Sequence, residues 1–572
     1  MIIDFRNVNA LWSSVLVETL CRLGVTTAVV CPGSRSGPLT TSFAQHPEIE
    51  AIPILDERSA AFFALGRGKI TGIPVALVCT SGTAGANFYP AIIEARESGV
   101  PLLVLTADRP PELRHCHSGQ TIDQQKLYGN YPSWYAELSL PSEEMDQLRY
   151  LRQTVVQAVA RSRFPFSAPV HLNLPFRDPL APIPVRFRGQ PLTRTLADFD
   201  GFFSHLVPPV SPTVQQPLPW ETWKNSDCGL IIAGVDQPLD AEKYCRAIAH
   251  LSNLLGWVVL AEGLSPVRNY AHLIPNLVST YDFILRDEET ANSLMPEMVI
   301  QIGAFPTSKT LRSWLSEISP SSWVIETAGE NIDPLHQKTI PLRINILEIF
   351  QVNGTFPALS SYQQQWLSLE AKMRQNLDHK LANAEELIEP KIPWYLSQLI
   401  PENTPIFIAN SLPVRDVEWF WQPNERKIYP LFNRGANGID GTLSTAMGIA
   451  HQGKPAVCLT GDLALLHDTN GFLQRQQLQG HLTIILVNNN GGGIFEMLPI
   501  AEFPDVFEEF FTTPQNLDFS ALCATYGIEY QLISNWEQLT PLLSQLPDSG
   551  IRVLEIRSDR AQSAKWRKEI MV

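Results

Sequence analysis

Short apolar runs recur along the whole chain, and each is followed by a stretch with the length and spacing of a helix. Such runs are typical of buried strands in a parallel sheet, because parallel neighbours need a crossover connection that is usually helical. The runs are TTAVVCPG, AIPILDE, PVALVCTSG, PLLVLTADR and PVHLNLP in a first block, GLIIAGV, WVVLAEG, MVIQIGA and SWVIETAG in a second, and PIFIANS, KIYPLFN, AVCLTGD, TIILVNN and RVLEIRS in a third. The pattern predicts an α/β protein with three parallel-sheet domains in tandem.

A chain of 572 residues is too long for one hydrophobic core, which also favours several domains. We expect an N-terminal domain over residues 1–185, a central domain over 223–360 and a C-terminal domain over 391–572. The proline-rich passage 186–222 is typical of an extended linker on a surface. The polar, helix-prone passage 361–390 predicts a helical linker.

Bulk composition narrows the classes of function. The formal net charge of −15 argues against a nucleic-acid or anionic-membrane partner. The eight cysteines are scattered without a CxxC pair, which fits a reducing compartment better than a disulfide framework or a zinc site. The first residues mix acidic and basic side chains into a helical period, and no run of 18 apolar residues exists. We therefore expect a cytoplasmic protein without a membrane span.

Two neighbouring strands of the third block stop at oxygen-bearing residues. CLTGDLALLHD places Asp462 directly after one apolar run, and TIILVNNNGGGIF places Asn489 after the next, 27 positions later. That spacing fits a βαβ unit, so both residues are expected at the carboxyl edge of one sheet, where α/β folds bind ligands. A carboxylate, an amide oxygen and a glycine-rich turn form an oxygen-only site that suits Mg²⁺ and a diphosphate, which the helix starting near Leu463 would also face.

A GD turn after a strand and a cluster of asparagines are each common in ordinary loops. Together, at this spacing, they resemble the diphosphate–metal motif of thiamine diphosphate enzymes. The resemblance implies Mg²⁺, with Mn²⁺ as a substitute, held by Asp462, Asn489 and the backbone carbonyl of Gly491. It further implies that the diphosphate lies against Gly461, Leu463 and Ala464.

The same resemblance implies a catalytic carboxyl group in the first domain. In these enzymes a glutamate just after a strand hydrogen-bonds the pyrimidine ring of the cofactor, and Glu57 in AIPILDERSAAFFALG stands there. Asp56 is the neighbouring competitor, and an acid in the first turn of a helix is the plain structural alternative.

Three further segments are implied to contact the cofactor. TSGTAGAN resembles a glycine-rich turn near the pyrimidine and carries Thr83 and Asn87. Ile439 in NRGANGIDG stands where these enzymes prop the cofactor into its bent form, although a core isoleucine is a close alternative. Ser411 and Ile494 complete the implied contacts.

Four arginines follow strands on the predicted ligand-binding edge, namely Arg35, Arg109, Arg415 and Arg434. A single loop arginine is usually a solvated charge. Four at equivalent places in an acidic chain indicate substrates with several carboxylates, because the guanidinium group binds carboxylates in bidentate fashion.

Seven segments together resemble one family over essentially the whole chain. They are GSRSGPLT, DERSAAFFALG, TSGTAGAN, TADRPPELR, NSLPVRD, NRGANGIDGTLSTAMG and NNNGGGIFEMLP. The family is that of the 2-succinyl-5-enolpyruvyl-6-hydroxy-3-cyclohexene-1-carboxylate synthases, transferases of menaquinone or phylloquinone biosynthesis. The resemblance implies that 2-oxoglutarate is decarboxylated and that the remaining four-carbon unit is added to isochorismate.

Roles carried over by motif give a substrate pocket made of Ser34, Arg35, Arg109, Gln120, Lys309, Ser411, Arg415 and Arg434, with Ile494 and Phe495 as its apolar wall. Two positions depart from relatives. Thr310 follows Lys309 where some members have a second basic residue, and Gly119 precedes Gln120 where Asn or Pro often stands. A solvated lysine that opens a helix is an equal alternative for Lys309.

The resemblance also implies a homodimer or a dimer of dimers with each active site shared between subunits. Glu57 would come from one chain, and Asp462, Asn489 and Gly491 from the other.

Four other functions stay open on sequence alone. Two are thiamine diphosphate enzymes, a 2-oxoacid decarboxylase and an acetohydroxyacid synthase-like carboligase, the second of which commonly carries a flavin. A nicotinamide-dependent oxidoreductase is suggested by GRGKITG at 66–72, but the glycine spacing differs and the segment has a helical pattern. A catalytically silent cofactor-binding regulator is disfavoured by the presence of Glu57, Asp462 and Asn489.

Overall fold

The computed structural model describes residues 3–184, 192, 194–209, 216–327 and 329–571. It contains three six-stranded sheets, and every pairing between their strands is parallel. The described residues fall into two compact units. Unit 1 lies within 1–212, 433–451 and 468–478, and unit 2 lies within 213–432, 452–467 and 479–572. No helix in the described ranges is long and apolar enough to cross a membrane.

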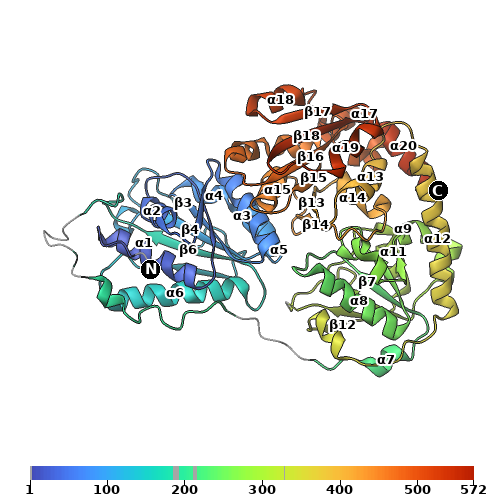
Figure 1. Cartoon of the computed structure of the whole chain (residues 1–572), viewed down its shortest axis with the longest axis horizontal. Coiled ribbons are helices and arrows are strands. Elements are labelled where there is room, and N and C mark those ends of the chain that lie inside the picture. Colours follow the sequence, from blue (N-terminus) through green and yellow to red (C-terminus); the bar gives the residue numbers. More distant parts are fainter. Residues whose placement is uncertain (1–2, 185–191, 193, 210–215, 328, 572) are drawn as a thin grey trace. The chain divides into compact units, whose positions relative to one another are not determined.

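The first sheet belongs to unit 1 and has the order β2-β1-β3-β4-β6-β5. Its strands β3, β4 and β6 are labelled in Figure 1. Its strands are β1 (Thr27–Val30), β2 (Glu50–Pro53), β3 (Val75–Cys79), β4 (Leu102–Asp108), β5 (Trp134–Glu137) and β6 (Pro169–Pro175). Its helices are α1 (Val8–Arg22), α2 (Gly37–Gln45), α3 (Glu57–Thr71), α4 (Thr83–Asn87), α5 (Tyr89–Glu97) and α6 (Met145–Arg163).

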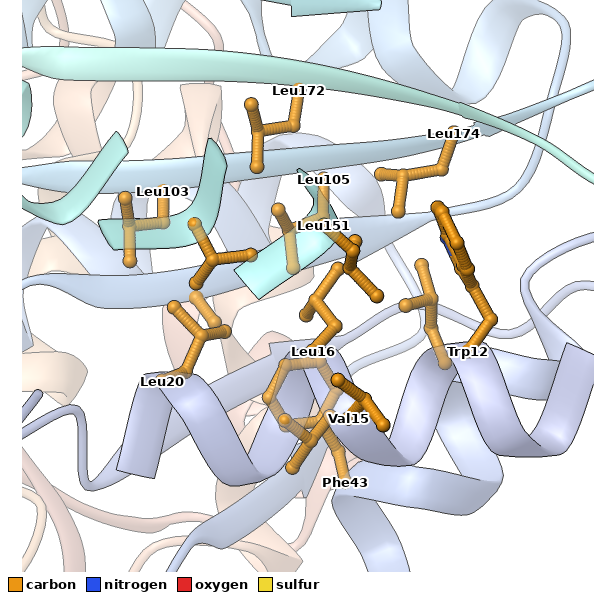
Figure 2. Packing of buried hydrophobic residues seen from close by; sticks show 14 of the residues in the cluster. Trp12, Val15, Leu16, Leu20, Phe43, Leu103, Leu105, Leu151, Leu172 and Leu174 are labelled. Carbon is orange, nitrogen blue, oxygen red and sulfur yellow. The ribbon is translucent and has the colours of Figure 1, made fainter. Parts of the chain in front are cut away.

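Leucines two positions apart on β4 and β6 build the core on one face of this sheet. Figure 2 shows Leu103 and Leu105 of β4, with Leu172 and Leu174 of β6, turned toward side chains of α1, α2 and α6. Alternate residues of a strand share a face, so the intervening residues point to the opposite side of the sheet. The central strands β3, β4 and β6 are thus buried on both faces of the sheet.

Unit 1 also contains α15 (Thr442–Ala450), which packs along α3 at very short range. A Cβ on Gly66 would lie 2.2 Å from the carbonyl oxygen of Thr445, and one on Gly448 would lie 2.1 Å from that of Phe63. Glycine at both positions lets the two helix backbones touch.

Part of the expected linker 186–222 packs on unit 1. Residues 196–199 form a short 3-10 helix, and Phe199, Phe202 and Phe203 are buried in the core of the first sheet. Positions 186–191, 193 and 210–215 of that linker lie outside the described residues.

The second sheet has the order β12-β11-β10-β7-β8-β9 and belongs to unit 2. Its strands are β7 (Gly229–Ala233), β8 (Val258–Ala261), β9 (Leu277–Val278), β10 (Met298–Ile302), β11 (Ser321–Ile325) and β12 (Thr339–Leu342). Its helices are α7 (Trp220–Lys224), α8 (Ala241–Leu255), α9 (Tyr281–Ile284), α10 (Glu288–Ser293) and α11 (Lys309–Ile318). The long helix α12 (Ser361–Ala382) follows within the expected helical linker 361–390.

The third sheet, also in unit 2, has the order β14-β13-β15-β16-β18-β17. Its strands are β13 (Pro405–Ile408), β14 (Tyr429–Phe432), β15 (Ala456–Gly461), β16 (His481–Asn488), β17 (Glu529–Ile533) and β18 (Gly550–Arg557). Its helices are α13 (Lys391–Leu399), α14 (Leu412–Phe420), α16 (Asp462–His467), α17 (Pro504–Val506), α18 (Phe519–Tyr526), α19 (Leu539–Ser544) and α20 (Arg560–Met571).

A buried ion pair joins the central and C-terminal domains inside unit 2. Arg268, from the 3-10 helix Pro266–Leu273, lies 3.2 Å from the carboxylate of Glu418 on α14 and donates to the Glu418 backbone carbonyl at 2.7 Å. The Tyr281 hydroxyl also donates to this carboxylate. Neither charged side chain is more than 1% exposed, so each needs the other to remain buried.

Candidate active site

Asp462 and Asn489 occupy the same edge of the third sheet. Strand β15 ends at Gly461 and β16 ends at Asn488, and the register of this parallel pair sets Gly461 opposite Val487. Asp462 and Asn489 follow directly, at the carboxyl ends of neighbouring strands. The backbone N–H of Gly491 donates to the Asp462 carboxylate at 2.8 Å, which ties the two strand ends together.

Asp462 is a buried carboxyl group, and no lysine, arginine or histidine in the described part of the chain forms an ion pair with it. Burial raises its pKa to about 6, against the opposing effect of backbone N–H groups of Leu463, Gly491 and Asp462 itself, while the nearby Glu389 carboxylate raises it further. The first amides of α16 therefore turn toward Asp462. A cation at this carboxylate would offset the cost of keeping its charge buried.

The amide of Asn489 has a fixed orientation. Its Nδ2 donates to Oε1 of Glu389 at 2.8 Å. Its Oδ1 is buried and accepts no hydrogen bond from the part of the chain that the structure describes. A buried oxygen without a partner lowers the free energy of unfolding, unless a ligand binds to it.

Gly491 forms a backbone turn that a residue with a side chain does not readily adopt. Its φ is +141°, and a Cβ there would lie 2.4 Å from the carbonyl oxygen of Thr512. The Gly491 carbonyl accepts one hydrogen bond, from Gly493 at 3.0 Å, and keeps a second lone pair. With the orphaned amide oxygen and the buried carboxylate it makes an all-oxygen donor set, which fits Mg²⁺.

The turn after β13 carries two predicted substrate residues. Ser411 has φ +75° and ψ −126°, a conformation that costs a non-glycine residue of order 1–3 kcal/mol and is concentrated at functional sites. Arg415, one turn into α14, donates to the Ser411 carbonyl at 2.6 Å. The strained turn and the guanidinium group are thus held together.

The remaining unit 2 residues of the prediction are spread over two places. Ile494 and Phe495 are half-buried in the short 3-10 helix Gly493–Met497, and the Phe495 ring packs edge-on against Phe511 at 5.5 Å between centroids. Lys309 is exposed at the first position of α11 in the central domain, and no contact joins it to the other predicted substrate residues among the described ones.

In unit 1, the structure separates the two candidate acids at the start of α3. Asp56 is the N-cap of the helix, accepts from the Ser59 N–H at 2.9 Å and accepts from the Asn470 amide at 2.8 Å. Glu57 is the first helical residue, is half-buried, and makes no side-chain hydrogen bond to the described part of the chain. Asp56 is therefore occupied by capping, whereas Glu57 is left for a ligand.

Three predicted cofactor residues and the predicted substrate residue Arg434 lie near the surface of unit 1. Thr83 and Asn87 are exposed on α4, where the Asn87 amide donates to the Thr83 carbonyl at 3.3 Å. Arg434 and Ile439 are half-buried in the loop before α15, so Ile439 is not a core residue.

Two arginines of unit 1 come close to each other at the carboxyl edge of the first sheet. Arg35 is 7% exposed and donates to the Phe176 carbonyl at 2.8 Å. Burial and the charge of Arg109 lower the pKa of Arg35. Its nearest acid, Asp178, is largely exposed and 3.9 Å away. The two guanidinium groups thus attract anions, in line with the predicted carboxylate pocket.

Ser81 organises the surroundings of Arg109. Its hydroxyl accepts from Arg109 Nη1 at 2.6 Å and donates to the Gln120 carbonyl at 3.1 Å. The Gln120 amide returns a hydrogen bond to the Ser81 carbonyl at 3.0 Å, and Arg109 also donates to the Gly119 carbonyl at 3.1 Å. Ser34, by contrast, is exposed and forms no hydrogen bond with Ser81, Arg109 or Gln120.

A buried polar network adjoins the cluster formed by Ser81, Arg109 and Gln120. The Gly82 N–H donates to the Gln124 side chain at 2.9 Å, and Gln124 donates to Asn173 Oδ1 at 3.1 Å. Asn173 in turn donates to Asp108 at 2.8 Å, and Arg114 neutralises Asp108 at 2.9 Å. Asp108 thus has a cation of its own, and the acid paired with Arg35 is the exposed Asp178.

Sequence reasoning missed the residues that hold the site residues in place. Ser81, Gln124 and Asn173 in unit 1, and Glu389 and Arg567 in unit 2, were not singled out as functional residues. Ser81 had a local signal, because it lies inside TSGTAGAN. Glu389 had none, since its contact with Asn489 spans 100 residues.

Family models cover most of the chain in three consecutive pieces. Residues 12–127 match the N-terminal thiamine pyrophosphate binding domain of thiamine pyrophosphate enzymes, 201–408 match the middle domain, and 418–556 match the C-terminal thiamine pyrophosphate binding domain. The three sheets and the oxygen-lined strand ends thus define a thiamine diphosphate-dependent enzyme.

Full-length relatives narrow the class. A protein of Gloeothece citriformis is 58% identical over 99% of this chain and 98% of its own length. Proteins of Rippkaea orientalis and a Nostoc species are 57% and 58% identical over 100% of this chain and 97% and 98% of theirs. All three are named 2-succinyl-5-enolpyruvyl-6-hydroxy-3-cyclohexene-1-carboxylate synthase. This chain belongs to that synthase family.

Proposed function

We propose that this protein decarboxylates 2-oxoglutarate and adds the remaining four-carbon unit to the ring alkene of isochorismate. The products are 2-succinyl-5-enolpyruvyl-6-hydroxy-3-cyclohexene-1-carboxylate and carbon dioxide, in a step of menaquinone or phylloquinone biosynthesis. The observation that carries this proposal is family membership over the whole chain together with the paired guanidinium groups of Arg35 and Arg109. Both substrates are dicarboxylates, and a small monocarboxylic substrate would not need two such groups.

The cofactor in this proposal is thiamine diphosphate with Mg²⁺, for which Mn²⁺ can substitute. Asp462, Asn489 and Gly491 hold the ion through a carboxylate, an orphaned amide oxygen and a carbonyl. Gly461, Leu463 and Ala464 line the diphosphate; a Cβ on Gly461 would meet no atom within 4 Å, which leaves open space there. When bound, thiamine diphosphate supplies a nucleophilic thiazolium carbon and the electron sink for decarboxylation.

The protein side chains mostly bind the cofactor and the substrates and orient them for reaction. Glu57 shares a proton with the pyrimidine ring and so supports activation of the cofactor. Arg35, Arg109, Arg415 and Arg434, with Ser34, Gln120, Lys309 and Ser411, neutralise and fix the substrate carboxylates in reacting geometry. Ile494 and Phe495 form an apolar wall that excludes water, while Thr83, Asn87 and Ile439 complete the cofactor contacts.

The working assembly is proposed to be a homodimer or a dimer of dimers in the cytoplasm. Each active site then combines Glu57 of one chain with Asp462, Asn489 and Gly491 of another.

One assay tests the reaction. The protein is incubated with thiamine diphosphate, Mg²⁺, 2-oxoglutarate and isochorismate, and the products are identified by mass. The proposal expects the fourteen-carbon adduct, because the ten carbons of isochorismate gain four from 2-oxoglutarate after loss of carbon dioxide. Free succinic semialdehyde accumulating beside unconsumed isochorismate would instead indicate a 2-oxoacid decarboxylase. A bound flavin and condensation of pyruvate would indicate an acetohydroxyacid synthase.

A further inference from the structure

Glu389 lies beside the proposed metal site but supplies no ligand to it. It stands between α12 and α13, is 2% exposed, and accepts three side-chain hydrogen bonds. Asn489 and Ser558 donate to its Oε1 at 2.8 and 3.2 Å, and Arg567 donates to its Oε2 at 2.6 Å.

The carboxylate of Glu389 dictates which end of the Asn489 amide is presented to the site. The Oε1 oxygen of Glu389 acts as an acceptor, for the Ser558 hydroxyl as well as for Asn489, so Asn489 turns its NH₂ group toward it. The amide oxygen is then forced to the other side, where it is buried and lacks a partner among the described residues. That oxygen is the atom a hard cation requires, whereas the reversed amide would point N–H groups at the cation.

Arg567 holds Glu389 in place. It projects from α20, is fully buried, and bridges Glu389 to Asp416 of α14, to which it donates from Nε at 2.7 Å and from Nη2 at 2.6 Å. Burial opposes the charge of Arg567, but Asp416 and Glu389 outweigh it and raise the pKa of the guanidinium group. The charged guanidinium group of Arg567 thus holds the Glu389 carboxylate, and this carboxylate in turn holds the amide of Asn489.

We propose that Glu389, held by Arg567, is a positioning residue that orients Asn489 for the divalent cation. This inference rests on the proposed metal site formed by Asp462, Asn489 and Gly491. Groups that orient a metal ligand typically change metal affinity about 10–100-fold when they are replaced.

Glu389→Gln is the direct test. A glutamine cannot accept from both Asn489 and Arg567 without turning its own NH₂ group toward one of these donors. We expect the Mg²⁺ concentration that half-saturates thiamine diphosphate binding, measured by calorimetry, to rise about 10–100-fold. Glu389→Asp keeps the charge but shortens the reach to Asn489, and it serves the same purpose if Glu389→Gln fails to fold.

Asp416→Asn is the matched control. It makes the same carboxyl-to-amide change on the other side of Arg567, without touching Asn489. We expect the half-saturating Mg²⁺ concentration to stay within about twofold of wild type, since no ligand-orienting bond is lost. An equal rise in both variants would overturn the inference, because it would mean that Glu389 acts only through the fold around Arg567.

The variant Asn489→Asp separates orientation from charge. A carboxylate at position 489 presents an oxygen whichever way it turns, so Glu389→Gln added to N489D should produce no further rise in the Mg²⁺ requirement. A full rise in that background, or no rise in the wild-type background, would overturn the inference and leave the proposed reaction intact. Wild-type protein that binds thiamine diphosphate independently of Mg²⁺ would overturn the metal site and this inference together.

Discussion

His171 on β6 is a buried, neutral histidine of unit 1, and Thr106 links it to Asn173 of the buried polar network. The Thr106 hydroxyl donates to Asn173 Oδ1 at 2.9 Å, so it can only accept from His171 Nε2, 2.8 Å away. The proton therefore sits on Nε2, and Nδ1 is buried without a hydrogen bond among the described residues. Burial lowers the pKa of His171 from 6.5 to about 3, because a second proton would be charged and unpartnered.

This shift predicts an acid-sensitive contribution to stability. The folded pKa lies below the ordinary value, so the unfolded chain binds the proton first as pH falls. The contribution of neutral His171 is complete above pH 6.5 and is lost progressively as pH falls toward 3. We expect His171→Gln to lower the melting temperature at neutral pH. The decrease in melting temperature between about pH 7 and about pH 5 should be smaller in the variant than in the wild type. An identical pH dependence of melting in the variant and wild type would refute this assignment.

The sequence indicated site residues that follow strands but not the residues that hold them. Asp462 and Asn489 were found because a parallel sheet brings the ends of successive strands to one edge. Arg567 lies 178 positions from Glu389, and no local periodicity encodes a contact at such a separation. The sequence favoured Glu57 by resemblance and left Asp56 as a competitor, and the hydrogen bonds of Asp56 now separate the two.

At the scale of elements, the strands that sequence reasoning missed are all at sheet edges. They are β5 in the first sheet, β9 and β12 in the second, and β17 in the third. An edge strand is covered less completely, so it lacks a continuous apolar run; in β12 and β17 only the last residue is buried. The central strands are buried along nearly their whole length. Their largely apolar runs were therefore visible in the sequence.

The crossing of α3 and α15 gives a prediction at this scale. Gly66→Ala places a Cβ 2.2 Å from the backbone oxygen of Thr445, so the two helices must separate. We expect a loss of about 1–3 kcal/mol, which outweighs the gain in helix propensity of about 1 kcal/mol.

Gly68→Ala on the same helix is the control for this change. Its Cβ comes within 3.0 Å only of the end of the Val100 side chain, at 2.7 Å, which can move, while the Pro101 carbonyl oxygen lies at 3.4 Å. Thermal melting should therefore show a lower midpoint for Gly66→Ala than for Gly68→Ala. Equal midpoints would mean that the close approach of the backbones is unimportant.

For the whole molecule, a shared active site predicts complementation between inactive variants. Glu57→Gln should lose turnover by orders of magnitude, and Asp462→Ala should lose it through the metal, while both keep their fold. In a mixed dimer, one site carries both substitutions and the other carries neither. Random mixing of equal amounts makes half the dimers mixed, so about a quarter of wild-type activity should return.

The complementation experiment requires subunit exchange, which co-expression of two differently tagged chains provides. Two variants in the same site half, Asp462→Ala and Asn489→Ala, are the control and should not complement each other. Mixed dimers of Glu57→Gln and Asp462→Ala that stay inactive would argue for sites built within one chain.

The central claim is that a divalent cation clamps a diphosphate at the edge of the third sheet, between Asp462 and Asn489. Calorimetric titration of thiamine diphosphate into the metal-free protein, with and without added Mg²⁺, tests it most directly. The account predicts binding that depends on Mg²⁺ in the wild type and is lost in Asp462→Ala. Equal affinity with and without Mg²⁺, or an affinity unchanged in Asp462→Ala, would contradict it.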